Sequence, residues 1–140
     1  MMKPPANRRA ALALGTAILF APPAHACPTA EQGFRRLVAA DAEVAYRLEP
    51  EGLKVGEFFT AEVVACRAPG LEPVHAIAVD ATMPDHGHGM NYRPAATSAA
   101  PGHYRFIGLM LHMPGRWRIT IDLFHGSKRT RLTREVDLGP

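Results

Sequence analysis

The sequence predicts an all-β protein, an immunoglobulin-like β-sandwich of about seven antiparallel strands. Two observations predict it. After residue 40, apolar and polar residues alternate with period two over repeated short segments, which is the pattern of half-buried strands. Pro and Gly residues punctuate these segments as turns. With 140 residues, 47% of them hydrophobic, the chain can form one domain with a core of its own.

The first 26 residues have the three regions of a secretory signal peptide. The first nine carry three bases and no acid, and Ala10–Phe20 is an uncharged apolar run. Ala24 and Ala26 then occupy the −3 and −1 positions of an A-x-A cleavage site. The apolar run is shorter than the roughly 20 residues that span a bilayer. We therefore expect cleavage after Ala26, export to the periplasm, and a mature chain without a transmembrane segment.

Removal of this segment changes the charge balance. The whole chain has 16 Lys and Arg against 13 Asp and Glu. Lys3, Arg8 and Arg9 account for the entire excess, so the mature domain, 27–140, is formally neutral. A neutral exported domain is a poor nucleic-acid binder, and that class of function is excluded.

Two cysteines remain, Cys27 and Cys66. One even pair in an oxidising compartment predicts a disulfide that ties the mature N-terminus to the domain. The alternative is a lipid anchor at Cys27, because this residue directly follows the cleavage site. Ala24 stands at −3, where lipoproteins usually have a leucine-type residue, so the disulfide is preferred.

The elements follow in order. Thr29 and Gln32 fit a capping box, and Phe34 and Leu37 fall on one helical face, so a short helix or turn is expected over Pro28–Ala39. Strands are expected at Glu43–Leu48, Phe58–Cys66, Val74–Met83, Tyr104–His112, Arg116–Phe124 and Arg129–Leu138.

The segment Arg116–Phe124 shows the clearest alternation. Trp117 and the aliphatic residues at every second position after it are expected to face the core. Thr120 and Asp122 are expected to face water. The last predicted strand is charged, as suits a sheet edge.

Histidine and methionine are concentrated in two segments. Met83–Tyr92 holds two of each in ten residues, and Leu111–Gly115 adds one of each at a turn. Imidazole together with thioether favours copper, since Met is a soft ligand and His binds both oxidation states. Zinc would more often recruit Cys or carboxylate, and the only acid nearby is Asp85.

We expect a surface copper site made of His86, His88, Met90 and His112, with Met113 as a further ligand. His86 and His88 lie two residues apart, and the glycine between them allows both rings to reach one ion. The alternative is a flexible Gly-rich turn, with Met113 filling the core. The residue pattern is compatible with both oxidation states of the bound ion, Cu(I) and Cu(II).

Three segments resemble the YtkA-like domains of exported bacterial proteins, which are related in pattern to the periplasmic part of FixH-like proteins. They are Asp80–Tyr92 (DATMPDHGHGMNY), Pro101–Tyr104 (PGHY) and Gly108–Trp117 (GLMLHMPGRW). The resemblance implies a small immunoglobulin-like sandwich associated with copper or with respiratory oxidase assembly. It also implies that the five predicted ligands occupy the family's recurring His and Met positions.

Two functions follow as hypotheses. The first is an exported, non-catalytic copper-binding or copper-handling protein, whose partner is a copper-accepting or respiratory-assembly protein of the envelope. The second is an interaction module that docks on an envelope partner through the HGHGM and HMPG loops without metal. No nucleophile-elbow, carboxylate-pair or phosphate-loop motif indicates an enzyme.

Overall fold

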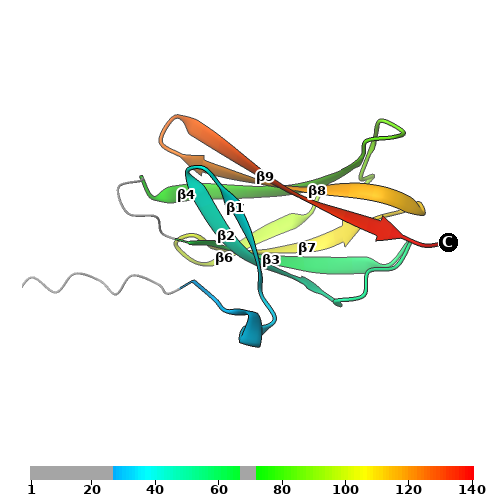
Figure 1. Ribbon diagram of the computed structural model, residues 1–140, viewed down its shortest axis with the longest axis horizontal. Coiled ribbons are helices and arrows are strands. Elements are labelled where there is room, and N and C mark those ends of the chain that lie inside the picture. The colour runs from blue at the N-terminus through cyan, green and yellow to red at the C-terminus, as the bar shows by residue number, and fades with distance from the viewer. Residues whose placement is uncertain (1–26, 67–71) are drawn as a thin grey trace, which may run out of the picture.

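The protein is described by a computed structural model over residues 27–66 and 72–140, and the chain forms a β-sandwich (Figure 1). Among these residues, a five-stranded sheet has the order β1-β2-β3-β7-β6 and a four-stranded sheet has the order β5-β4-β8-β9. All pairings between neighbouring strands are antiparallel. The elements are η1 (Ala30–Gln32), β1 (Arg35–Ala39), β2 (Ala42–Glu49), β3 (Phe58–Cys66), β4 (Val74–Met83), β5 (His88–Gly89), β6 (Ala95–Ala100), β7 (His103–Met110), β8 (Gly115–His125) and β9 (Lys128–Leu138).

The predicted fold class is confirmed, and the predicted strands match β2, β3, β4, β7, β8 and β9. The predicted signal peptide, 1–26, lies outside the described residues. Within the part of the chain that is described, no helix combines the length and the apolar character needed to cross a membrane.

The N-terminal segment differs from its prediction. A 3₁₀ helix covers only Ala30–Gln32, and the main-chain N–H of Thr29 donates to Gln32 Oε1 at 2.9 Å. Gly33 then adopts a left-handed conformation (φ 78°) that ends the helix. The second half of the predicted helix is wrong, since Arg35–Ala39 is strand β1, paired with β2.

Two further strands were not predicted from the sequence. The first, β5, has only two residues, which is too short for a periodic pattern. The second, β6, consists of Ala, Thr and Ser and is almost wholly exposed. It has no alternation of apolar and polar side chains, and its strand conformation comes from pairing with β7.

The core lies between the two sheets. Each sheet contributes the inward residues of its strands, including Val63 and Phe106 from one sheet and Val79 and Ile121 from the other. Trp117 on β8 is the largest fully buried side chain, with 0% exposure. Its inward position was predicted and is confirmed.

The outer face of β8 corrects the prediction for Thr120 and Asp122. Both are buried, at 9% and 8% exposure. The strand lies between β4 and β9, so side chains from its neighbours cover it. Arg131 on β9 donates from Nε and Nη2 to the two carboxylate oxygens of Asp122, each at 2.8 Å. This pairing compensates for removal of the Asp122 charge from water.

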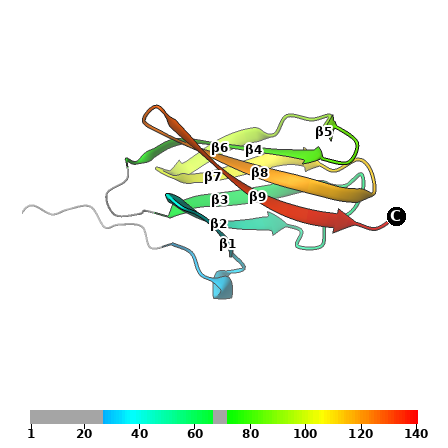
Figure 2. The ribbon, with the colours of Figure 1, turned by 45° about the horizontal axis from the view of Figure 1, so that its top comes forward.

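The predicted His/Met loops lie at one end of the sandwich. Because β7 ends at Met110 and β8 begins at Gly115, one short turn joins the two sheets there. The end of β4 pairs with the start of β8, Thr82 opposite Arg118. The loop carrying β5 therefore lies at the same end as this turn and the chain's C-terminus (Figure 2).

The outer face of the five-stranded sheet carries a charged network centred on Glu62 of β3. His103 Nε2 lies 2.6 Å from Glu62 Oε1, and Arg47 Nη2 lies 2.6 Å from Glu62 Oε2. Burial by itself would raise the Glu62 pKa. The hydrogen bonds from His103 and Arg47 and their charges outweigh burial, so the pKa is lowered.

Replacing Glu62 with Gln is expected to lower the free energy of unfolding by about 1–2 kcal/mol at pH 7, because charge-assisted hydrogen bonds are lost. A lowered folded-state pKa stabilises the fold above the ordinary value of 4.5, and this contribution disappears as pH falls through the folded-state pKa. Urea denaturation of wild type and variant should therefore converge at low pH. Glu57→Gln, at an exposed position, is the control; a gap that persists undiminished at pH 2–3 would contradict the assignment.

Candidate metal site

The segment that carries His86 and His88 is a tight turn. The N–H groups of His86 and Gly87 both donate to the Met83 carbonyl oxygen, at 3.2 and 2.9 Å. Gly87 has a φ of 65°, in the left-handed region that favours glycine. The chain then returns along β4, pairing His88 with Met83. The glycine between the histidines thus provides the bend that the sequence predicted.

This turn places the two imidazole rings side by side. The ring centroids of His86 and His88 are 6.2 Å apart and the ring planes differ by 23°. Both side chains are exposed. Two imidazoles that bind one ion from opposite sides, each with a metal–nitrogen bond of about 2 Å, have centroids roughly 6 Å apart. The observed separation matches that value, and because the rings are stacked, both nitrogens reach one ion only after rotation of these exposed side chains.

His112 lies in the turn between β7 and β8. Its ring meets the ring of Trp117 edge to face, with centroids 5.4 Å apart. The Trp117 indole N–H donates to the Met113 carbonyl oxygen at 2.9 Å, which holds the turn against the core. The Nδ1 atom of His112 is buried and has no hydrogen-bond partner. An imidazole nitrogen without a hydrogen-bond partner has a lone pair that a metal ion could take up.

An ion pair joins the two loops. Nη2 of Arg116, at the start of β8, donates to both carboxylate oxygens of Asp85, at 2.7 and 3.0 Å. Hydrogen bonding and charge from Asp85 raise the pKa of Arg116. The sequence drew attention to Asp85 as the lone acid of its loop, but nothing in the sequence identified Arg116 as its partner.

The methionines contribute to packing as well. Met90 and Met113 are partly buried and pack against the main core. Met83, the last residue of the predicted strand Val74–Met83, is 1% exposed and belongs to the core. A Cβ added at Gly115 would approach Met83 Cε to 2.9 Å, so the backbone of the turn passes directly over this side chain.

The structure brings the predicted ligands to one end of the fold without gathering them into a closed site. Among the described residues, the His, Cys, Asp and Glu side chains that lie within 4.8 Å in groups of three or more are Cys27, Glu43 and Cys66. His86, His88 and His112 do not form such a group. A site using all three requires a rotation of side chains in the exposed loop.

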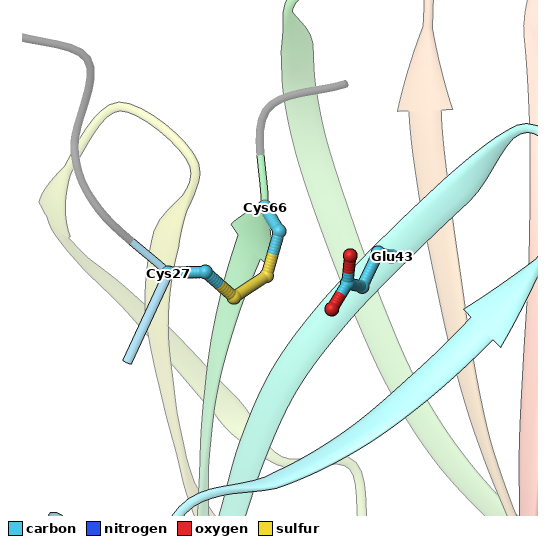
Figure 3. Close-up of side chains that lie close together, drawn as sticks. All are labelled: Cys27, Glu43 and Cys66. Atoms are coloured by element: carbon cyan, nitrogen blue, oxygen red, sulfur yellow. A yellow bond between two sulfur atoms is a disulfide. The ribbon is translucent and has the colours of Figure 1, made fainter. Parts of the chain in front are cut away.

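The Cys27–Glu43–Cys66 group is occupied by a covalent bond (Figure 3). Cys27 and Cys66 form a disulfide with a Cα–Cα distance of 5.1 Å, as predicted. Their sulfurs are therefore not available as metal ligands, and Glu43 pairs with Arg36 on the neighbouring strand.

A cavity of about 630 Å³ lies elsewhere, between β2 and β9. None of the five predicted ligands lines it. The candidate metal site is a surface feature of the loop end and is separate from this cavity.

A family model described as YtkA-like matches residues 37–122, more than half of the chain and all five predicted ligands. No curated protein matches the sequence.

Solved structures share the fold at low identity. A DUF4426 family protein from Pseudomonas aeruginosa is 15% identical with a TM-score of 0.53, over 78% of this chain and 97% of its own. A DUF4785 family protein from Legionella pneumophila is 10% identical with a TM-score of 0.50, over 71% of this chain and 28% of its own. A copper-bound FetP variant from uropathogenic Escherichia coli is 10% identical, with a TM-score of 0.48 over 74% of this chain and 93% of its own. At such low sequence identity, these structures show a shared fold alone, and the copper in the FetP variant is a property of that protein.

Proposed function

This protein belongs to the YtkA-like family, and we propose that it is an exported, non-catalytic protein that binds and hands on copper through a His/Met surface site. The observation that carries the proposal is the exposed pair of rings, His86 and His88, whose centroids lie 6.2 Å apart. The unpartnered Nδ1 of His112 is the second support.

The donor set suits copper. Imidazole and thioether are the ligands that copper accepts in both oxidation states, and Met favours Cu(I). His86 and His88 would make the first contact with the ion, because both are exposed. Met90, His112 and Met113 are further ligands in this proposal and would complete the coordination as the loop adjusts.

The arrangement also suits transfer of the ion. The sandwich provides a rigid platform, and its end loops provide ligands that a partner can reach. We propose the periplasm as the compartment, supported by the sequence of residues 1–26 and by the disulfide. The partner would be a copper-accepting or respiratory-assembly protein of the envelope.

Titration of the purified exported protein with Cu(I) and Cu(II), against a competing chelator, tests this function. We expect about one equivalent bound with sub-micromolar affinity, and a loss of about 100-fold or more in the His86→Ala/His88→Ala variant, which lacks both imidazoles. His75→Ala is the matched control, since His75 is exposed at the start of β4, away from the loops. Binding that survives the double substitution would refute the site.

One observation favours the second candidate, a docking module without metal. Phe58 and Tyr92 are 57% and 47% exposed, and their rings meet edge to face with centroids 5.4 Å apart. Exposed aromatic pairs are typical of protein interfaces. Absence of copper binding, together with loss of partner capture in Phe58→Ser/Tyr92→Ser, would favour this function instead.

A further inference from the structure

The Asp85–Arg116 ion pair removes the one carboxylate of the loop from the candidate site. Both oxygens of Asp85 accept from the same nitrogen of Arg116, at 2.7 and 3.0 Å. Asp85 immediately precedes His86, so this carboxylate is the oxygen ligand closest in sequence to the paired imidazoles. A carboxylate held by a guanidinium is a poor competitor for a metal ion, since its lone pairs and its charge are already engaged.

Arg116 is well placed to keep this contact. It lies opposite Asp137 in the β8–β9 pairing, and Glu135 is also near enough to raise its pKa. Asp85 is the acid that its guanidinium bonds, through both carboxylate oxygens. The contact also joins the loop that carries His86 to the start of β8, next to the turn that carries His112.

Withholding a carboxylate alters which ions the site accepts. Divalent Zn²⁺ commonly takes four ligands and accepts carboxylate oxygen readily. Imidazole and thioether alone form a softer and less charged donor set, which favours Cu(I). With Asp85 held by Arg116, the donor groups that remain in this loop are the neutral imidazoles of His86 and His88 and the thioether of Met90.

We propose that Arg116 determines the selectivity of this site: by holding Asp85, it makes the site take Cu(I) in preference to divalent Cu²⁺ and Zn²⁺. The proposal rests on the proposed function, because it requires that the His86–His88 pair binds copper. Arg116 is a positioning residue here, since it acts on the ion through Asp85 and does not contact it.

The test compares dissociation constants for Cu(I), Cu(II) and Zn(II) in wild type and Arg116→Gln. In wild type, we expect Cu(I) to bind more tightly than either divalent ion. In the variant, the freed carboxylate should tighten Zn(II) and Cu(II) binding by up to about fivefold, the worth of an exposed ion pair, while Cu(I) affinity changes little. The exposed ion pair contributes little to stability, so the variant should fold, which circular dichroism would verify.

Two controls separate ligation from simple charge. Arg118→Gln removes the same charge two residues away, from a side chain that pairs with Glu135, and should leave the ratio of affinities unchanged. Adding Asp85→Asn to Arg116→Gln should abolish the gain in divalent affinity. An unchanged ratio in Arg116→Gln, or an equal gain in Arg118→Gln, would overturn the selectivity role while leaving copper binding intact. Wild type that binds neither Cu(I) nor Cu(II), or binds copper independently of His86 and His88, would overturn the proposed function as well.

Discussion

Loss of the Cys27–Cys66 disulfide is expected to lower the free energy of unfolding by about 4 kcal/mol, which makes it one of the two largest effects we predict. The bond joins residues 39 apart in sequence, and a closed loop of this length restricts the unfolded chain strongly. It also anchors the N-terminal segment, because Phe34 packs with Ala45 and Val64 beside the two cysteines on the outside of the five-stranded sheet.

Denaturation of wild type with and without a thiol reductant, beside Cys27→Ser/Cys66→Ser, would measure this effect. The reduced protein and the double variant should behave alike, and the reductant should not affect the variant. Equal stability of the oxidised and reduced wild type would contradict the prediction. Intact mass of the exported protein adds an independent check, since a lipid on Cys27 would exclude the disulfide.

The position of this bond separates stability from metal binding. The disulfide lies at the end of β3 opposite to its start at Phe58, and the candidate ligands lie at the Phe58 end. Reduction should therefore loosen the N-terminal segment and leave the His86–His88 turn unchanged. Copper affinity of Cys27→Ser/Cys66→Ser, measured without thiol and below its unfolding transition, should therefore equal that of wild type.

Much of the fold could be predicted from alternation alone. The strands β3 and β4 were predicted with their observed bounds because each has an apolar face and clear ends. Strand β1 was not, because Phe34 and Leu37 match a helical period equally well over so short a segment. Pairing with β2, which is a contact distant from the local pattern, decides between the two.

The candidate site was predictable in composition and unpredictable in its contacts. Local clustering identified His86, His88 and Met90, and Gly87 indicated that the chain could bend there. The partner of Asp85 could not be predicted, because Arg116 lies 31 residues away and reaches it only through the pairing of β4 with β8. The burial of Asp122 was missed for the same reason, since its cover comes from a neighbouring strand.

Trp117 connects the core to the candidate site, and its replacement by Ala is expected to cost about 3–5 kcal/mol of unfolding free energy. The side chain is 0% exposed and contacts the turn that carries His112 and Met113. Alanine would leave a cavity, remove the aromatic neighbour of His112, and leave the Met113 carbonyl without its indole donor. The turn that carries both predicted ligands should lose its support.

Two variants separate these contributions. Trp117→Phe keeps an aromatic ring and loses the indole N–H, so beyond a smaller packing loss it should cost about 1 kcal/mol for the hydrogen bond to Met113. Val38→Ala, at a position that is 74% exposed, is the control and should change stability by less than about 0.5 kcal/mol. Urea denaturation gives the energies, and the nitrogen chemical shifts of His112 report whether its ring stays fixed. If Trp117→Ala unfolds within about 1 kcal/mol of wild type, or the His112 shifts do not move, the indole does not hold this turn in place.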